Sequence, residues 1–411
     1  MVADRVRRRD TYFYRAGRLT QRHAASSLGI LLLLSVPILA VAIAVPVSYD
    51  YYAQLPGGHP ATIGLARLGA TFGNGYAVPS YALVTFAAPL LVGNATNASE
   101  FVDLENLTAL ANGTGGIAAV KSPVGPYGAP LQAWLALDTA PPAARTNLLG
   151  TLSGYLGSDG RTVLLSLQTN DTGLSGGAVA AVQSVESSFD QYRGAHPEIT
   201  ALAYGGGAPT IHDLAAETDH ATELMILAVT IGLIVVLLAV LRSWIIAVLA
   251  VGTIGLSIGW AWAITYLCFD LGLGFPLFFY VRTLLIMLVL GLGIDYNIFV
   301  LTRVREETLA GRSAGEASVE AVGRTGGIIT AAAVILACAF AALIVGEFTL
   351  IRAIGFSVAI AVVLDAMVVR TYFVPSVLQL LGARVWNLSG RRTRAAPAAP
   401  PPPAGDGPST P

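Results

Sequence analysis

The sequence predicts an α-helical membrane protein, in which a bundle of six transmembrane helices carries one α+β domain. Of its 411 residues, 54% are hydrophobic and only 12% are charged, whereas soluble domains carry about 25% charged residues. Six apolar stretches reach the length of about 20 residues that a spanning helix needs. They lie near residues 28–48, 222–241, 244–268, 277–301, 326–346 and 354–380. A water-soluble enzyme is therefore excluded.

The order of these stretches divides the chain into five parts. A basic segment, 1–27, precedes the first helix at 28–48, and a long polar segment, 49–220, separates that helix from helices two to six within 221–381. The first helix is expected to remain as an anchor, because its apolar run is longer than that of a signal peptide. The tail, 382–411, is rich in Pro and Ala. It is expected to be disordered, because such a composition buries too little apolar surface.

The arginines flanking the spans predict the orientation. Basic residues collect on the cytoplasmic side, which places both termini in the cytoplasm of a multi-pass protein of the cell membrane. Segment 49–220 then lies outside, and its five Asn-x-Ser/Thr sequons agree with that location. The flanking arginines are Arg5, Arg7, Arg8, Arg9, Arg15, Arg18, Arg22, Arg242, Arg303, Arg305, Arg312, Arg324, Arg384, Arg391, Arg392 and Arg394.

Helical and extended patterns alternate in the long segment, which is typical of a small α+β layer. Helices are expected over 60–73, 99–111 and 179–193, strands over 81–87, 117–121, 163–169 and 200–204, and a linker over 122–157. A further helix starts at Thr210 and runs directly into the second span. Its polar cluster (His212, Asp213, Glu217, Asp219 and His220) admits a metal site or a proton antenna, but we favour a solvated helix start.

The segment shows no catalytic constellation, metal spacing or nucleic-acid motif, so no enzyme activity, cofactor, metal or nucleic-acid partner is predicted. Lys121 is the only lysine, and no glycine loop precedes it. A P-loop needs a lysine at the end of such a loop to reach the phosphates of ATP, so the chain contains no P-loop. Any pumping must therefore draw on an ion gradient or on a partner protein.

Ionisable residues inside spans are functional candidates, because each costs at least ~2.5 kcal/mol in the bilayer. The fourth span contains Asp295, Tyr296 and Asn297 together, and we predict a proton relay at Asp295 and Tyr296. Gly291 and Gly293 remove side chains from the preceding turn, so another helix or water can reach the carboxylate. Burial raises the pKa of a carboxyl group, which suits a site that gains and loses a proton.

The sixth span offers Asp365 and, five residues on, Arg370. Asp365 pairs with Arg370 or with a hydroxyl such as Thr330 of the fifth span. A static ion pair and a second proton site remain open. Separately, Gly255 and Gly259 have the spacing of a close helix contact in the third span.

At these spans the sequence resembles a known family. The runs GLGIDYNIFVLTRVREE (291–307), TGGIITAAAVILACAFAAL (325–343) and IGFSVAIAVVLDAMVVRTYFVPSVLQLLG (354–382) resemble the MMPL family of the RND transporter superfamily, over about residues 12–385. The resemblance implies an RND-type bundle, a porter-type, ferredoxin-like outer domain, and proton-driven export of lipids or other hydrophobic molecules. It assigns the family's Asp-Tyr pair to Asp295 and Tyr296, and its acid of the sixth span to Asp365.

Complete members of the family contain two such six-span repeats, whereas this chain has one. We therefore expect a homodimer, a heterodimer with a second six-helix half, or a fragment of a longer protein. Two other functions remain open: an accessory subunit of protein export from the same superfamily, and a lipid-binding module similar to sterol-sensing domains. A purely structural scaffold leaves the cost of burying Asp295 unexplained.

Overall fold

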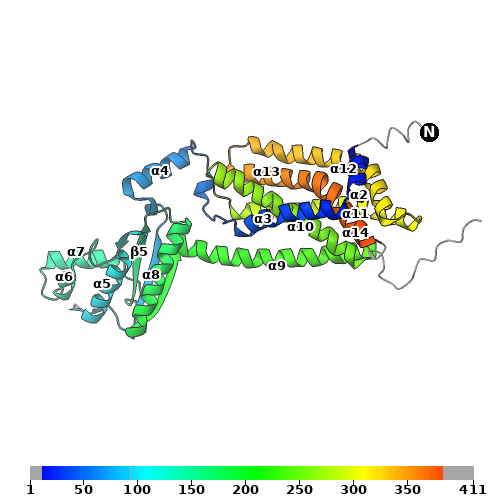
Figure 1. Ribbon diagram of the computed structural model, residues 1–411. Coiled ribbons are helices and arrows are strands. Elements are labelled where there is room, and N and C mark those ends of the chain that lie inside the picture. Colours follow the sequence, from blue (N-terminus) through cyan, green and yellow to red (C-terminus); the bar gives the residue numbers. More distant parts are fainter. Residues whose placement is uncertain (1–11, 94, 383–411) are drawn as a thin grey trace, which may run out of the picture.

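The computed structural model describes residues 12–93 and 95–382. Figure 1 shows an elongated molecule with an α+β domain at one end and a helical bundle at the other, and one long helix, α9, extends from the domain along one side of the bundle. Helix α2 (Tyr12–Arg22) and the last helix both lie at the end of the bundle that is far from the α+β domain. The first arginines, the sequon at Asn94 and nearly all of the predicted tail 382–411 lie outside the described residues.

Six helical segments are long and apolar enough to cross a membrane, which confirms the predicted spans. Several of the spans consist of an α-helix that continues into a 3₁₀ or π segment. In chain order the elements are α3 (Ala24–Ala44), α9 (Gly207–Leu241), α10 (Trp244–Tyr266) with η3 (Leu267–Gly272), α11 (Phe279–Leu309), α12 (Ala314–Ala341) with η4 (Ala342–Val345), and α13 (Thr349–Leu364) with η5 (Asp365–Phe373) and α14 (Val374–Leu381).

The α+β domain lies between the first and second spans, as the sequence predicts. Its main elements follow the order β1 (Ser80–Phe86), α5 (Ala98–Asn112), β4 (Ile117–Lys121), β5 (Thr162–Thr169), α8 (Gly176–Ala195) and β6 (Ile199–Gly206). The sheet order is β4-β5-β1-β6, and all neighbours are antiparallel. This β-α-β-β-α-β order is that of a ferredoxin-like fold. In β1 every second side chain is buried, as expected for a sheet with one covered face.

The prediction of a linker over residues 122–157 is wrong. It contains α6 (Leu131–Leu135) and α7 (Pro142–Ser153) and belongs to the domain core. Trp134 is fully buried, stacks on Phe101 with ring centroids 5.0 Å apart, and donates from Nε1 to the carbonyl of Pro123 at 3.1 Å. The many Pro, Ala and Gly residues of this segment are typical of a linker, so composition alone does not indicate that Trp134 belongs to the core.

Smaller elements complete the domain and its connection to α3. They are η1 (Tyr52–Gln54), α4 (Pro60–Phe72), η2 (Asn74–Tyr76), β2 (Leu91–Val92) and β3 (Ala95–Thr96). Helix α4 buries none of its residues and stands apart from the bundle in Figure 1.

Helix α9 begins at Gly207, three residues before the expected start at Thr210, and continues for 35 residues. Gly206 ends β6 with φ of 87°, a conformation that glycine adopts at no steric cost. The strand therefore turns directly into the helix, without a loop between the α+β domain and the bundle.

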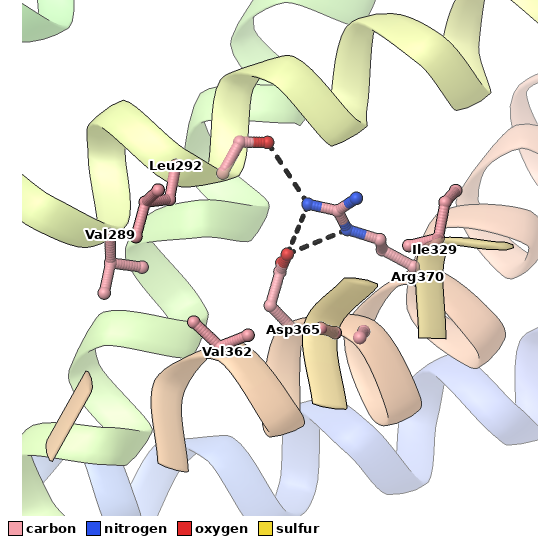
Figure 2. Close-up of a pocket in the computed structure, with 9 residues that line it drawn as sticks. Val289, Leu292, Ile329, Val362, Asp365 and Arg370 are labelled. Carbon is pink, nitrogen blue, oxygen red and sulfur yellow. Dashed lines mark hydrogen bonds and ion pairs between the residues drawn. The ribbon is translucent and has the colours of Figure 1, made fainter. Parts of the chain in front are cut away.

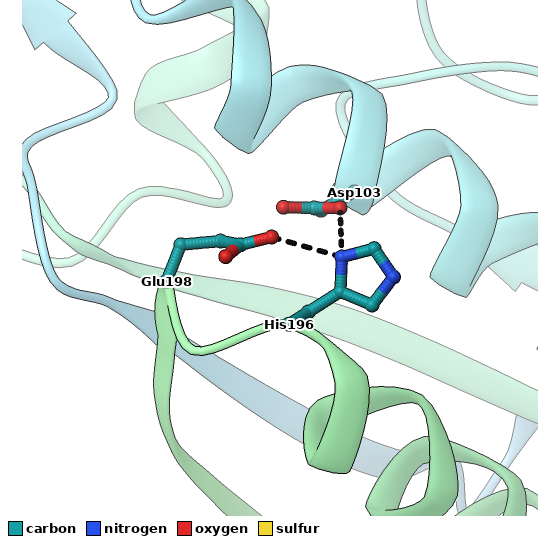
Figure 3. Close-up of side chains that lie close together, drawn as sticks. All are labelled: Asp103, His196 and Glu198. Atoms are coloured by element: carbon teal, nitrogen blue, oxygen red, sulfur yellow. Dashed lines mark hydrogen bonds and ion pairs between the residues drawn. The ribbon is translucent and has the colours of Figure 1, made fainter.

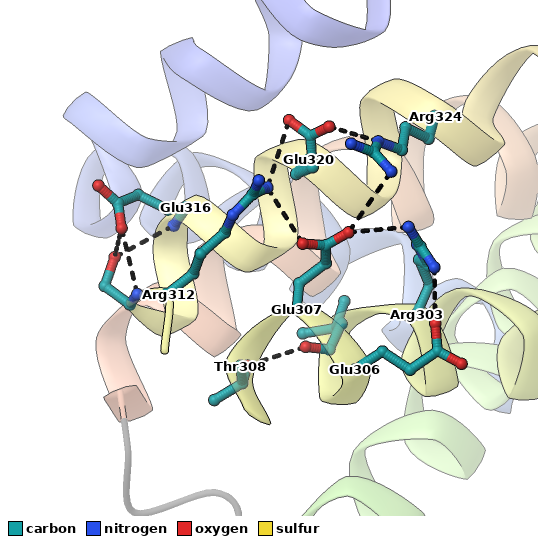
Figure 4. A network of polar contacts seen from close by, with 10 residues as sticks. Arg303, Glu306, Glu307, Thr308, Arg312, Glu316, Glu320 and Arg324 are labelled. Atoms are coloured by element: carbon teal, nitrogen blue, oxygen red, sulfur yellow. Dashed lines mark hydrogen bonds and ion pairs between the residues drawn. The ribbon is translucent and has the colours of Figure 1, made fainter. Parts of the chain in front are cut away.

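At the far end of the bundle, a charge network ties α11 to α12 (Figure 4). Glu307 is buried and forms ion pairs with Arg303 at 2.9 Å, Arg312 at 3.1 Å and Arg324 at 3.8 Å. Ser313 and Glu316 begin α12 with a reciprocal capping box. Three arginines of the basic loop that predicts the orientation are thus paired with acids of α11 and α12.

Candidate functional site

A buried ion pair lies halfway along the sixth span. Asp365 and Arg370 are 6% and 5% exposed, and Oδ2 of Asp365 accepts from Nε of Arg370 at 2.8 Å and from Nη2 at 2.5 Å. Figure 2 shows the two side chains pointing toward each other within the bundle. Such two-point contact fixes both groups more firmly than a single bond.

The five-residue spacing of this pair follows from the local helix type. Asp365–Phe373 forms a π-helix, in which residues five apart follow one another on the same face. The hydroxyl of Thr371 likewise donates to the carbonyl of Ala366, five residues earlier, at 3.1 Å. An ordinary α-helix would turn Arg370 away from Asp365.

Two further helices complete what we call the polar centre: Ser257, Gly293, Asp365 and Arg370. Ser257 of α10 donates to Oδ1 of Asp365 at 3.2 Å, and Nη2 of Arg370 donates to the carbonyl of Gly293 in α11 at 3.1 Å. Ser257, rather than Thr330, is the hydroxyl partner of Asp365. A small side chain spaced between apolar residues of α10 is the only sequence signal for it.

Asp295 does not join the polar centre. It is exposed on α11 and belongs to a row spaced at four residues, which we call the Asp295 face: Met287, Gly291, Asp295 and Phe299. Met287 is 47% exposed and Phe299 is 52% exposed. Because residues four apart share one side of a helix, the carboxylate sits on an apolar surface of α11 that points away from the rest of the bundle. Tyr296 follows Asp295 in α11.

The other polar residue of the predicted relay faces inward. Asn297 is buried and its Nδ2 donates to the carbonyl of Ala250 in α10 at 3.4 Å. The structure therefore separates Asp295 and Asn297 onto different sides of α11.

The four glycines expected at helix contacts fall into two pairs. A Cβ at Gly293 would lie 3.1 Å from Ile254 of α10, and one at Gly259 would lie 2.4 Å from Leu39 of α3. At Gly255 and Gly291 a Cβ would meet no atom within 4 Å among the described residues. This differs from the packing expected at these two positions, because both glycines point outward from the single bundle.

Two small cavities meet at Arg370. One, of about 10 Å³, is lined by Val289, Val362 and Asp365 among others (Figure 2). The other, of about 20 Å³, is lined by Thr325, Thr330 and Thr371 on the side toward α2. The second cavity has room for about one water molecule, together with hydroxyl partners for it.

A second polar group, which we call the junction, links α11 to α9 near the α+β domain. Nη2 of Arg282 lies 2.5 Å from Oδ1 of Asp219, and the Tyr49 hydroxyl donates to the same oxygen at 3.2 Å. Burial, together with the neighbouring Asp219 carboxylate, raises the pKa of Tyr49 to about 12. Asp219, expected in a solvated helix start, is partly exposed and also pairs with Arg282. No motif in the sequence marks Arg282.

Six candidate spans, a polar centre at mid-span and a domain continuous with one span define a multi-pass membrane protein. The chain belongs to the MMPL family, part of the RND superfamily, whose family model matches residues 53–399. The resemblance in the sequence is thereby confirmed.

The chain is similar to a siderophore exporter and to several probable transport proteins of mycobacteria. The chain is 26% identical over 254 residues to the siderophore exporter MmpL5 of Mycobacterium tuberculosis (strain CDC 1551 / Oshkosh), covering 62% of this chain and 26% of that protein. It is 24% identical to the probable transport protein MmpL4 of Mycobacterium leprae (strain TN), covering 62% and 27%. The probable transport protein MmpL6 of M. tuberculosis is 26% identical, covering 56% and 58%. The chain thus spans about a quarter of two of these relatives and somewhat more than half of the third.

Proposed function

We propose that this chain is one half of a proton-driven secondary transporter that exports lipids or other hydrophobic molecules and catalyses no reaction. In this proposal it lies in the cell membrane with both termini in the cytoplasm and the α+β domain outside. The observation that carries the proposal is the exposure of the Asp295 carboxylate on an apolar face of a spanning helix. The cargo of one relative, a siderophore, is a second candidate cargo.

The exposed carboxylate implies a covering partner. Against lipid, a carboxylate at this depth costs at least ~2.5 kcal/mol, so a second six-helix half on the Asp295 face lowers the free energy. Gly291, one turn before Asp295, has open space where a side chain would stand. A helix of the partner, either a second copy or a different half, can therefore approach the carboxylate closely.

Proton coupling follows from the two acids. Protonation of Asp295 changes its attraction to the partner across this seam. Protonation of Asp365 removes the charge that holds Arg370, whose guanidinium also bonds the carbonyl of Gly293, two residues before Asp295. The cavity beside Thr325, Thr330 and Thr371 supports access of water to this pair.

The junction supports transmission to the α+β domain. Helix α11 carries Asp295, and its other end holds α9 through Arg282 and Asp219. Because α9 continues from β6 without a loop, a shift of α11 moves the domain, which opens and closes around the cargo. One charge crossing 100 mV supplies about 2.3 kcal/mol, enough to shift a two-state equilibrium substantially.

Reconstitution of the purified chain into liposomes with a fluorescent lipid tests the proposal. An imposed pH gradient is expected to drive transport by the wild type and by Asp270→Asn, a partly exposed acid at the end of a span, but not by Asp295→Asn. Transport by Asp295→Asn at the wild-type rate would contradict the proposal. Lipid binding without gradient-driven transport in any variant indicates either a lipid-binding module or a requirement for a different second half, and co-purification of a partner distinguishes the two. Export of a protein cargo favours the accessory subunit.

A further inference from the structure

The α+β domain brings together three metal-ligating side chains away from the bundle. Asp103 lies on α5, His196 follows the last turn of α8, and Glu198 immediately precedes β6 (Figure 3). Nδ1 of His196 lies 3.1 Å from Oδ1 of Asp103 and 2.8 Å from Oε1 of Glu198. One ligand atom from each residue lies within 4.8 Å of the others.

One carboxylate oxygen in this group lacks a partner. Asp103 is only 4% exposed, and its Oδ2 is buried and accepts no hydrogen bond from the described residues. Figure 3 shows the Asp103 carboxylate facing Glu198 and the imidazole of His196. The other oxygen, Oδ1, accepts from the hydroxyl of Tyr192. Because a buried oxygen without a hydrogen-bond partner is costly, Oδ2 points to a cation between the three side chains.

The surrounding residues hold two of the ligands in position. The ring of Tyr192 stacks on His196 with centroids 3.9 Å apart and planes within 6°. Its hydroxyl donates to Oδ1 of Asp103 at 2.8 Å and accepts from Nδ2 of Asn106 at 3.0 Å. Such supporting contacts orient metal ligands and raise metal affinity.

We propose that Asp103, His196 and Glu198 bind a divalent transition-metal ion, with Zn²⁺ as the best match. Zinc takes histidine nitrogen at about 2.0–2.1 Å and carboxylate oxygen at about 2.0–2.2 Å in tetrahedral geometry, which separates ligand atoms by about 3.3 Å. The nitrogen–oxygen distances of 2.8 and 3.1 Å approach that value. An imidazole ligand favours zinc or its neighbours over magnesium and calcium.

The site is open to solvent on one side. The side chains of His196 and Glu198 are 31% and 30% exposed, so an ion enters without unfolding of the domain and a water completes its coordination. The bound ion joins α5 to the connection between α8 and β6, and thereby links the two β-α-β halves of the domain.

Zinc binding to the full chain, purified in detergent without a histidine tag, tests this site. Titration with Zn²⁺ is expected to give one equivalent that His196→Gln and Glu198→Gln each lose. Tyr192→Phe keeps this equivalent but is expected to bind about 10–100-fold more weakly. His212→Gln is the matched control, because His212 is exposed in the same domain and bonds Gln183 instead.

Thermal unfolding gives an independent readout. Zn²⁺ is expected to raise the Tm of the wild type and of His212→Gln, EDTA to reverse the rise, and Ca²⁺ or Mg²⁺ at equal concentration to leave the Tm unchanged. Zinc stoichiometry in His196→Gln and Glu198→Gln equal to that of the wild type would overturn the assignment. A Tm rise equally large with Ca²⁺ would also overturn it.

Discussion

The guanidinium of Arg370 bonds the Asp365 carboxylate in its own span and the backbone carbonyl of Gly293 in α11, at 3.1 Å. Gly293 lies in the turn that leads to Asp295. A Cβ there would lie 3.1 Å from Ile254, so the missing side chain lets α11 pack closely on α10. The buried pair and the exposed carboxylate are therefore connected through two residues of helix backbone. A change in the charge of the buried pair can therefore act on the backbone of α11 next to Asp295.

Removing one partner of the buried pair should be costly. Arg370→Met leaves Asp365 as a buried charge without its cation, which is expected to lower the free energy of unfolding by about 3–5 kcal/mol. The double variant Asp365→Leu, Arg370→Met should regain most of this loss, because no charge remains. Unfolding in detergent measures both, and Arg193→Met, at an exposed pair with Asp190, should change stability by less than about 1 kcal/mol. Equal destabilisation by the single and double variants would contradict a buried ion pair.

Cysteine cross-linking checks the covering of the Asp295 face. In a background with Cys268 and Cys338 replaced by Ala, Phe299→Cys or Met287→Cys is expected to form disulfide-linked dimers in membranes. Ile335→Cys on α12, 72% exposed, should stay monomeric, because it lies on another helix than the Asp295 face. Cross-linking at Ile335 with the same yield, or none at either position of the Asp295 face, speaks against pairing of two copies through this face.

The junction should contribute little to stability but strongly to transport. The side chains of Arg282 and Asp219 are 32% and 47% exposed, so a double-mutant cycle is expected to give a coupling of at most about 1 kcal/mol. Gradient-driven transport by Asp219→Asn should nevertheless fall, because the ion pair that links α11 to α9 is lost. The matched control is Glu217→Gln, on the same helix. Full transport by Asp219→Asn would exclude this link from the coupling path.

Alkaline pH should weaken the same region. The folded state raises the pKa of Tyr49 from 10.0 to about 12, so the folded chain holds this proton more tightly than the unfolded chain. The resulting stability is fully present below pH 10 and is lost as the pH rises through about 12. Absorbance of the phenolate and unfolding against pH measure the effect. Tyr49→Phe should lack this loss between pH 10 and 12, and an unchanged slope in that variant would assign the effect to other groups.

Trp134 should anchor the segment between β4 and β5. Trp134→Ala removes a fully buried ring, which is expected to lower stability by about 3–5 kcal/mol. Trp244→Ala, at a position 57% exposed, should cost far less. Circular dichroism during heating compares the stability of the two variants. Equally small losses of stability would show that residues 122–157 do not contribute to the domain core.

The sequence predicts the local features of the fold but not the polar contacts between distant helices. Six apolar runs and four strands follow from composition and periodicity, which are local properties. The pairing of Asp365 with Arg370 was also within reach, since both lie in one span. Ser257 and the link between Asp219 and Arg282 were not, because their partners lie 108 and 63 residues away. Which helices are neighbours decides these contacts, and no local pattern carries that information. The outward direction of Asp295 likewise depends on which sides of α11 its neighbours cover.

The uninterrupted course of α9 gives the molecule unequal lever arms. From Asp219, where Arg282 holds it, the helix extends about 18 Å toward β6 and about 33 Å into the bundle, at 1.5 Å per residue. In the proposed transport cycle, a rotation of α9 about this contact would move its end at the domain roughly half as far as its end in the bundle.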